Sequence, residues 1–542
     1  MTWPIPSDQK LDEFDAMELP GQQLKSAHAT SQLDHCLNLD VMAPPACTRL
    51  TGIIATMGVA THDLYMMERM MAAGMNIAML NMNFGGRDVH IETIKMLRQA
   101  CKNYSRSICK TYPLAIAAQV AGKKIRTGRI ADTYGESVEL KNGDTVKLTT
   151  DETYKERCSM YTVYIDFMYF AEQIKKGAVV ILDNDTISLV VEIVSASTLT
   201  CRVDRGGILT SYRDVFVPNM VFDMPNYSEK DKADIRMLVN YDIDILVASY
   251  VCSPQSIHEL RTLIGEKGKR ILIVANIQNS EGFKNFDSII QVADGVMVTR
   301  QELGSDLSPK KLVIAQKNLV ARANKANCPV TVSAHVLSSM RYRKTPLRSE
   351  LLDLANAVLD GADTLVLSAE TAVGKFPLEA VTTMAGACKE AETCLWTRHV
   401  FRNFMDQTPM PCDLVEGTSL AAVLAAHRLL AAAIFVITTT GQSAKVIAKY
   451  RPRCPIVAIT RYSMIARQLH LFRGIVPVVY DDMPDAAWNV DLEKRVNFGT
   501  KWCMDQGFVR IGDPIVVVSG WRQGSGFTNT MRIVYAAEEV QV

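Results

Sequence analysis

The chain has 542 residues, more than one hydrophobic core supports, so we expect two to four domains. Hydrophobic residues make up 48% and charged residues 22%, and the formal net charge of +1 gives no reason to expect nucleic acid as a partner. No apolar run is long enough to span a bilayer, so we expect no membrane partner either.

The chain begins with a polar leader, residues 1–49. Its first part, MTWPIPSDQKLDEFDAMELP, is acidic and interrupted by proline, and it does not fit a signal or transit peptide. The thirteen cysteines lack the paired spacing of a zinc site or a disulfide framework, and their odd number favours reduced thiols. These features predict a cytoplasmic protein.

After the leader, short β-branched runs alternate with amphipathic helical stretches. About eight such β/α units predict a TIM barrel, (β/α)8, which we assign to residues 50–122 and 225–395. We expect strands at 53–57, 76–82, 114–120, 243–251, 271–277, 294–299, 329–334 and 363–368, and helices that include 62–73, 89–104, 255–267, 309–326 and 348–361.

One further segment interrupts this alternation of strands and helices, and another resumes it after the barrel. Residues 123–224 contain short strand candidates and turns, such as KIRTGRI and VKLTT, which predict a small β-barrel domain inserted into a barrel loop. Residues 396–542 return to an α/β pattern with AAIFVITTTGQSAKVIAKY and DPIVVVSG, typical of an open α/β domain. The predicted fold class is therefore α/β with three domains.

Motifs spread over most of the chain match one known family. They are TGIIATMG (51–58), KIRTG (124–128), ILIVANIQNSEG (271–282), ANAVLDGAD (355–363), SAETAVGKFPLEAV (368–381), YRPRCPIVAIT (450–460) and GWRQGSGFTNTMR (520–532). In these motifs and in domain order the chain resembles the pyruvate kinases. The resemblance implies the glycolytic transfer of a phosphoryl group from phosphoenolpyruvate to ADP, with Mg²⁺ and K⁺ as cofactors.

Compared position by position, the resemblance also implies that catalytic and metal-binding groups have been replaced. The family lysine that stabilises the transferred phosphoryl group is Asn276 here, and the glutamate that holds the divalent metal is Gln278. Glu302 stands where the family has its metal-binding aspartate. Ala334 replaces a threonine that takes part in the proton-transfer step, and alanine can neither give nor accept a proton. Met79 replaces an arginine that pairs with the substrate phosphate.

The potassium and nucleotide positions are changed as well. The resemblance places Asn81, Asn83, Gln119 and Val120 at the potassium site, and Phe84 replaces a histidine near the nucleotide. The implied positions are catalytic Asn276, Ala334 and Arg126; substrate-binding Met79, Arg126, Arg300 and Ala334; nucleotide-binding Asn81, Phe84, Arg126 and Arg213; magnesium-binding Gln278 and Glu302; and potassium-binding Asn81, Asn83, Gln119 and Val120.

The C-terminal domain keeps more of the family pattern. VITTTGQSAKVIAKY (436–450) reads as a strand, a small-residue loop and a helix start, whose hydroxyls and N–H groups suit a phosphate. A turn with a helix cap explains this loop equally well. The resemblance implies an effector pocket for fructose 1,6-bisphosphate formed by Thr438, Thr440, Ser443, Trp488, Arg495, Trp521, Arg522 and Gly526.

Three functions are compatible with this pattern. The first is a catalytically impaired pyruvate kinase homologue, a pseudoenzyme that regulates or scaffolds as a homotetramer or with an active paralogue. The second is an active or residually active enzyme, with Lys123, Lys124 or Arg213 supplying charge. The third is a sugar-phosphate-binding module without catalysis.

Overall fold

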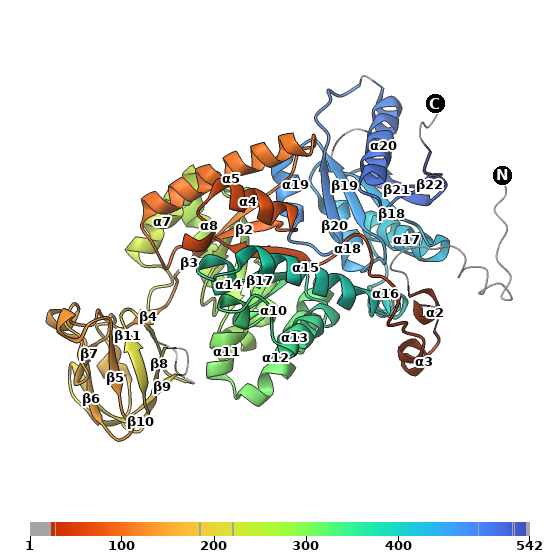
Figure 1. Cartoon of the computed structure of the whole chain (residues 1–542). Helices are drawn as coiled ribbons and strands as arrows, with labels where there is room; N and C mark the ends of the chain where they lie inside the picture. Colours follow the sequence, from red (N-terminus) through yellow and green to blue (C-terminus); the bar gives the residue numbers. More distant parts are fainter. Residues whose placement is uncertain are drawn as a thin grey trace.

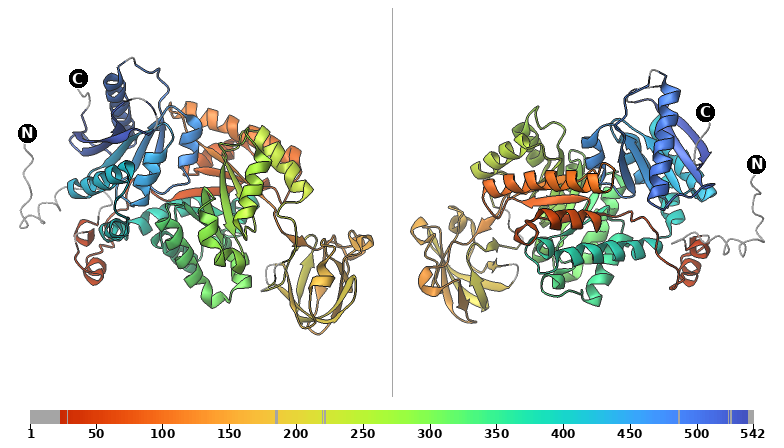
Figure 2. Two further views of the ribbon diagram at one scale, coloured as in Figure 1. Left: turned by 180° about the vertical axis from the view of Figure 1, so that it is seen from behind. Right: turned by 45° about the horizontal axis from the view of Figure 1, so that its top comes forward.

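The computed structural model describes residues 23–27, 29–183, 186–218, 220, 222–485, 487–522, 524 and 526–537. Three domains follow one another in space: a small β-domain, a central barrel and a C-terminal α/β domain (Figure 1). The β-domain projects from one end of the barrel, and the C-terminal domain covers the other end (Figure 2). Within the described residues, no helix is both long and apolar enough to cross a membrane.

Eight parallel strands close into a barrel in the order β1-β17-β16-β15-β14-β13-β3-β2, which confirms the predicted TIM barrel. Gly52 pairs with Thr364 where the first and last strands meet. The strands are β1 Gly52–Thr56, β2 Ile77–Asn81, β3 Ala115–Val120, β13 Ile245–Ala248, β14 Leu272–Ile277, β15 Gly295–Thr299, β16 Val330–Ser333 and β17 Thr364–Leu367.

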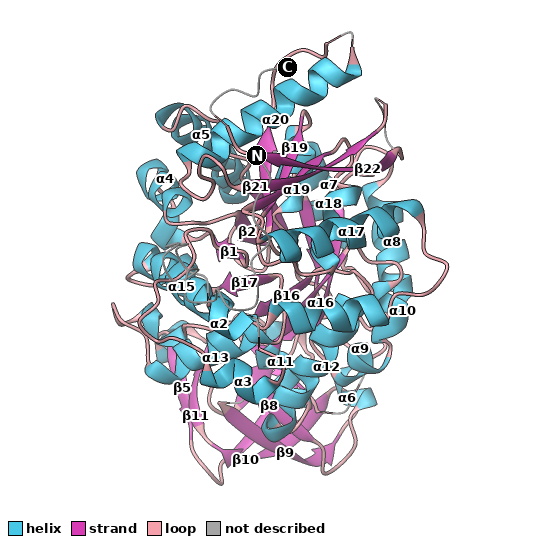
Figure 3. Cartoon of the chain, turned by 90° about the vertical axis from the view of Figure 1, so that its right-hand side faces the viewer, coloured by secondary structure: helices cyan, strands magenta, loops and turns pink. Residues whose placement is uncertain are grey.

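Helices surround these strands (Figure 3). Asp63 caps the first long helix by accepting a hydrogen bond from Met66 N, and Ser228 caps α7 through Asp231 N. The helices are α4 Leu64–Ala72, α5 Arg87–Ser107, α7 Glu229–Asn240, α8 Pro254–Ile264, α9 Ser280–Lys284, α10 Phe286–Ile290, α11 Arg300–Asp306, α12 Leu312–Lys325, α13 Arg348–Leu359, α14 Ala369–Ala372 and α15 Pro377–Thr393, with 3₁₀ turns at Val59–Thr61, Pro309–Lys311 and Ser338–Arg341.

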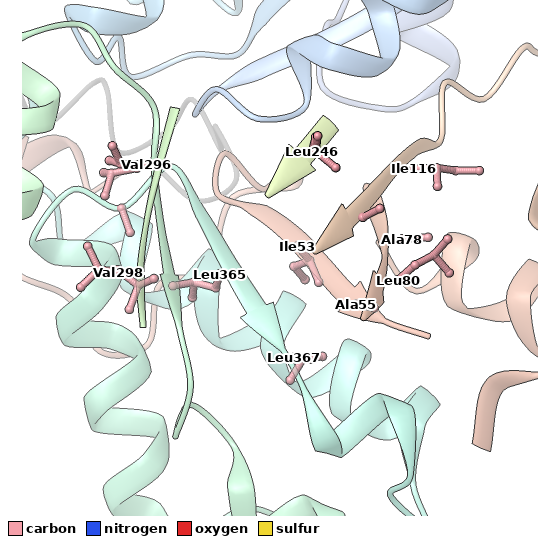
Figure 4. Packing of buried hydrophobic residues seen from close by; sticks show 14 of the residues in the cluster. Ile53, Ala55, Ala78, Leu80, Ile116, Leu246, Val296, Val298, Leu365 and Leu367 are labelled. Atoms are coloured by element: carbon pink, nitrogen blue, oxygen red, sulfur yellow. The ribbon is translucent and has the colours of Figure 1, made fainter. Parts of the chain in front are cut away.

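Both faces of the barrel strands are buried, so each strand reads as a continuous apolar run. Residues such as Ile53, Leu80 and Leu367 point outward and pack against the helices (Figure 4). The alternate residues, among them Ile54 and Met79, belong to a second core that continues into the C-terminal domain. This alternation decides which polar side chains at the strand ends face the barrel interior.

The inserted segment forms a curled seven-stranded sheet in the order β4-β12-β8-β9-β10-β6-β7, with a separate two-stranded ribbon, β11-β5. This curled sheet is the expected small β-barrel domain, and it has an apolar core of its own. Its elements are β4 Ile125–Arg126, β5 Ser137–Leu140, β6 Thr145–Thr149, β7 Thr162–Tyr164, β8 Val179–Leu182, β9 Ile187–Val194, β10 Thr198–Arg205, β11 Gly207–Thr210, β12 Asp214–Phe216, α6 Phe170–Gln173 and 3₁₀ turns at Asp132–Tyr134 and Glu152–Tyr154.

The C-terminal domain is a five-stranded sheet, β20-β19-β18-β21-β22, in which only β22 runs antiparallel to its neighbour. Separate apolar cores cover its two faces, which confirms the open three-layer α/β domain. Its elements are β18 Ala433–Ile437, β19 Ile456–Thr460, β20 Ile475–Val479, β21 Pro514–Gly520, β22 Thr528–Tyr535, α16 Thr397–Asp406, α17 Leu414–Leu429, α18 Gln442–Lys449, α19 Ser463–Leu469 and α20 Trp488–Asp505.

The described part of the leader contains two short helices, α2 Leu24–Ala27 and α3 Gln32–Leu37. They lie beside α16 (Figure 1). His35 anchors them, because its ring contacts Cys394 O at 3.0 Å through Nε2 and stacks on Trp396 at 5.5 Å between centroids. Residues 1–22 of the expected leader lie outside the described residues.

Candidate active site and effector pocket

The end of β14 carries two amides at the family's two charged positions. Asn276 has the same strand parity as Val274, which lies in the inner core of the barrel. Asn276 is fully buried, and its Oδ1 accepts a hydrogen bond from Thr299 Oγ1 at 2.6 Å. Gln278 Oε1 accepts from Tyr250 N at 2.8 Å. A hydroxyl and a backbone N–H, both neutral, therefore hold the two amide oxygens, while Asn276 Nδ2 has no partner among the described residues.

Glu302 lies in the first turn of α11, near Gln278. Burial raises the pKa of Glu302 above its usual value, against the lowering effects of nearby Lys124 and of a hydrogen bond with Gln278. Its Oε2 is covered and has no hydrogen-bond partner among the described residues. Within the same residues, no group of three or more His, Cys, Asp or Glu side chains lies close enough to hold a metal ion. Glu302 therefore does not belong to a cluster of three metal-binding side chains among these residues.

A charged cluster links the barrel to the β-domain. Arg126 donates to Asn83 Oδ1 at 2.8 Å and to Asn83 O at 3.2 Å. Its Nε pairs with Asp214 at 3.2 Å, and Lys124 Nζ reaches the other oxygen of Asp214 at 2.6 Å. Asn83 in turn donates to Asn81 Oδ1 at 2.8 Å. Two of the expected potassium-site residues are thus bonded to each other and to a guanidinium.

The other expected potassium positions face different ways. Gln119 faces the barrel interior and donates to Ser249 Oγ at 3.1 Å. Val120 points the opposite way, into the core beneath the helices. Phe84 is 69% exposed, and its ring centroid lies 5.7 Å from Arg126 Cζ. The structure therefore separates Val120 from the polar groups at the barrel mouth.

Met79 lies below the charged cluster, on the inner face of β2. It is 3% exposed and pairs in register with Thr56 and Ala117. Its apolar side chain belongs to the core inside the barrel. At this position the barrel offers no hydrogen-bond donor to a phosphate.

Arg300 closes the loop after β16. It is buried, and its guanidinium donates to Ala334 O at 3.0 and 2.8 Å and to His335 O at 2.8 Å. It also forms an ion pair with Asp353 at 2.7 Å. Ala334 and His335 both have positive φ, 69° and 54°, which L-residues rarely adopt, so these bonds stabilise an unusual turn. The donors of Arg300 are therefore occupied within the protein.

Arg213 lies in the β-domain. Its Nη1 forms an ion pair with Asp183 at 3.4 Å, and its Nε donates to Thr210 Oγ1. Its backbone N–H donates to Thr127 Oγ1 at 2.9 Å. These contacts hold the side chain within the inserted domain.

A cavity of about 350 Å³ opens between the β-domain and the barrel. Lys124, Asp214, Tyr250 and Glu302 line it, together with Glu281, whose Oε2 is covered and has no partner among the described residues. Sequence reasoning missed Asp214, Tyr250 and Glu281. Tyr250 follows the carboxyl end of β13, where active-site groups of barrels gather. Its position in the chain could therefore have identified it as a candidate.

The expected effector residues meet around a cavity of about 300 Å³ in the C-terminal domain. Gly441 has φ +80°, and its N–H donates to Thr438 Oγ1 at 2.9 Å, which shapes the turn before α18. Ser443 Oγ lies 2.7 Å from Thr528 Oγ1. Of the predicted set, Thr438, Thr440, Ser443, Trp488, Arg495, Arg522 and Gly526 line this cavity.

Three arginines line this cavity, and a buried carboxylate behind it pairs with two of them. Arg461 and Arg495 both pair with buried Asp491, and Arg495 Nε is covered without a partner among the described residues. Trp488 Nε1 donates to Gly520 O at 3.1 Å, which fixes the indole beside Arg495. Arg461 was missed from sequence, although it directly follows β19.

The loop 520–528 completes the rim. Arg522 is exposed and lies against Phe527, 3.8 Å from Cζ to the ring centroid. Trp521 is exposed and is not among the residues that line the cavity, unlike its prediction as a contact. Gln523 and Ser525 of this motif lie outside the described residues.

Comparisons with known proteins agree with this architecture. The family model described as pyruvate kinase, barrel domain, matches residues 48–381, and the model of the pyruvate kinase alpha/beta domain matches residues 416–534. The chain belongs to the pyruvate kinase family. Human and rat pyruvate kinase PKLR are each 40% identical over 95% of this chain and 89% of the relative. Pyruvate kinase 2 of Candida glabrata is 36% identical over 93% and 98%.

Proposed function

We propose that this pyruvate kinase homologue is catalytically impaired and acts as a regulatory or scaffolding subunit, with itself or with an active paralogue. The observation that carries the proposal is Asn276. Its fully buried amide is held by Thr299, where phosphoryl transfer needs a fixed positive charge. The test is pyruvate formation from phosphoenolpyruvate and ADP on the pure protein, followed by co-purification with an active pyruvate kinase.

The magnesium position supports this proposal. Mg²⁺ prefers carboxylate oxygens in tight octahedral geometry. Gln278 is neutral and its Oε1 already accepts from Tyr250 N, while burial favours the protonated form of Glu302. These residues do not fit a tight magnesium site, and we infer that the metal binds weakly.

The potassium position supports it too. Arg126 supplies a fixed positive charge to Asn83, and Val120 offers no side-chain oxygen. We infer that added potassium changes any residual rate little.

The position of Lys124 favours the alternative, in which the protein keeps residual activity. Lys124 lines the same cavity as Glu302 and attracts its carboxylate. However, its ammonium group is paired with Asp214 at 2.6 Å, which offsets the charge that it could offer a phosphoryl group.

We infer that the C-terminal cavity binds a sugar bisphosphate such as fructose 1,6-bisphosphate. Saturating ligand should raise the melting temperature, because ligand at about 100 times Kd adds ~2.7 kcal/mol to stability. Arg522→Ala should abolish the shift, since it removes the exposed guanidinium from the rim. Differential scanning fluorimetry measures it.

The matched control is Arg402→Ala, an exposed arginine of α16 that does not line the cavity. It should keep the full shift. No shift at millimolar sugar bisphosphate would remove the small-molecule role and also the third function, a sugar-phosphate-binding module.

We propose that the chain assembles as a homotetramer or a mixed tetramer. Ile314 on α12 and Leu352 on α13 are 67% and 73% exposed, and Lys317 Nζ joins the two helices through Asn356 at 3.2 Å. Such exposed apolar side chains on neighbouring helices suit a subunit interface. Light scattering should give a tetramer mass at micromolar concentration.

Charge on that surface should weaken the assembly. Ile314→Asp with Leu352→Asp should lower the measured mass, whereas Ile193→Asp, at an apolar residue of the β-domain that is 58% exposed, should leave it unchanged. A monomer of the unaltered chain, both alone and mixed with a paralogue, contradicts the proposal.

We also place the protein in the cytoplasm. All thirteen cysteines are free, as the odd count predicted, and this suits a reducing compartment.

A further inference from the structure

A third cavity lies at the end of the barrel opposite the active site. Its volume is about 530 Å³, and it is lined by the leader, by the barrel around Leu359–Gly361, and by the C-terminal domain. It shares no lining residue with the cavity between the β-domain and the barrel or with the cavity around Thr438 in the C-terminal domain. In Figure 1 the region lies where α2, α16 and the barrel helices approach one another.

The lining of this cavity is positively charged. Six lysine and arginine residues line it, against three carboxylates. One of the carboxylates, Glu392, already accepts hydrogen bonds from Leu50 N at 2.8 Å and Thr51 N at 2.7 Å. Another, Asp360, is paired with Lys317, which does not line the cavity. Two lining arginines are likewise paired outside the cavity, Arg451 with Asp363 and Arg322 with Asp287. By number, the basic side chains of the lining still exceed the acidic ones.

Arg473 carries the strongest signal. It is 5% exposed, and its Nη1 donates to Thr51 Oγ1 at 3.0 Å, but its Nη2 is covered and has no hydrogen-bond partner among the described residues. Arg451 pairs with Asp363 at 2.8 Å through Nη1, and its Nε also has no partner among these residues. Buried donors are normally satisfied, so covered donors without a partner, on two residues that line a cavity, indicate an acceptor that reaches them when a ligand is bound.

The burial of Arg473 is consistent with a bound anion. It lowers the pKa of Arg473, and neighbouring Arg451 adds to the effect, whereas Glu392 and Asp363 oppose it. An anion placed beside this guanidinium would stabilise its charged form.

Part of the wall is apolar, among uncharged polar side chains such as Asn403 and Gln407. Leu395 and Phe404 approach from the α16 region, and Leu430, Pro452 and Phe508 approach from the C-terminal domain. Pockets for small organic molecules combine such an apolar lining with a few polar groups that fix orientation. A bare inorganic ion would leave most of this surface uncovered.

We propose that this cavity binds a small organic anion, whose carboxylate or phosphate oxygen accepts hydrogen bonds from Arg473 Nη2 while its apolar body packs against Phe404 and Phe508. Because the site joins the leader, the barrel and the C-terminal domain, its ligand stabilises their packing. The site is independent of the proposed function.

Isothermal titration of the full chain tests the proposal with three probes: 4-phenylbutyrate, phenyl phosphate and inorganic phosphate. We expect saturable binding of at least one of the two organic probes, and the tighter of the two shows whether the natural anion is a carboxylate or a phosphate. Arg473→Gln should weaken that binding by about tenfold or more, as expected for the loss of a charge-assisted hydrogen bond.

A second variant keeps the test sound if Arg473→Gln fails to fold. Asn403→Trp fills the cavity from an exposed position on α16 and should weaken binding similarly, whereas neighbouring Met405→Trp, outside the cavity, should change it less than about twofold. Arg522→Ala should leave binding intact, which excludes the effector cavity. The proposal is overturned by no saturation at 10 mM of either organic probe, by inorganic phosphate binding as tightly as both, or by Kd values that neither Arg473→Gln nor Asn403→Trp alters.

Discussion

The purified protein should turn over phosphoenolpyruvate and ADP at less than about a thousandth of ordinary enzyme rates, which run from about 1 to 1,000 per second. Loss of one fixed electrostatic stabiliser costs about 3–4 kcal/mol of barrier, or a hundred- to a thousandfold in rate. Here Asn276 lacks the phosphoryl-stabilising charge, Gln278 lacks the metal carboxylate, and Met79 and Ala334 remove two further groups. A coupled pyruvate assay with saturating magnesium and potassium measures the rate.

Restoring one residue should not restore the rate. Asn276 is fully buried next to Thr299, so Asn276→Lys alone places an unpaired charge in the barrel and should destabilise it. The combined variant Asn276→Lys, Gln278→Glu, Met79→Arg and Ala334→Thr supplies both charges and the partner carboxylate, and it should be faster than any single change, because such groups act as a unit.

The matched control is Gln119→Ala, which alters the barrel mouth without adding a charged group and should leave the low rate unchanged. A kcat for the unaltered chain within the ordinary range would end the impaired-enzyme proposal. Lys124 would then be the first candidate for the missing charge, since it lines the same cavity as Glu302.

The barrel could be predicted from sequence because its strands are buried on both faces. The expected strand at 271–277 differs by one residue from β14, Leu272–Ile277, and the other strands differ by three residues or fewer at each end. Alternation also places Asn276 and Gln278 inside the barrel mouth. Their partners are Thr299 at the end of β15 and Tyr250 after β13, so the hydrogen bonds that hold the two amides could not be predicted.

Arg300 and Arg126 show where position alone is insufficient. Both occupy family positions for substrate binding, yet Arg300 is bonded to the carbonyls of Ala334 and His335. Those carbonyls belong to two consecutive residues with positive φ, a turn that no sequence pattern here indicated. Arg126 likewise depends on Asp214, which lies 88 residues away in the chain. The C-terminal cavity was easier to predict, since most of the residues expected there lie in two short motifs.

We expect the joint between the barrel and the C-terminal domain to depend on Asp244, so Asp244→Asn should lower the free energy of unfolding by about 2–3 kcal/mol. Asp244 is fully buried and pairs with Arg98 at 3.1 Å and with Arg467 of the C-terminal domain at 2.6 Å. It also accepts from Ile116 N at 2.9 Å. An asparagine removes the negative charge and turns a donor toward other donors, so two partly exposed guanidinium groups lose this buried counter-charge.

Asp242→Asn is the matched control, because it removes the same charge two residues away. Asp242 is 81% exposed in its side chain and reaches Arg467 only at 3.7 Å, so its loss should cost less than about 0.5 kcal/mol. Urea unfolding at one protein concentration, followed by circular dichroism, compares the two variants. Equal midpoints for both would mean that apolar contacts between Leu471, Phe472 and the inner barrel core hold the joint without this ion-pair network. A large loss for Asp244→Asn alone would assign that joint to a single buried carboxylate.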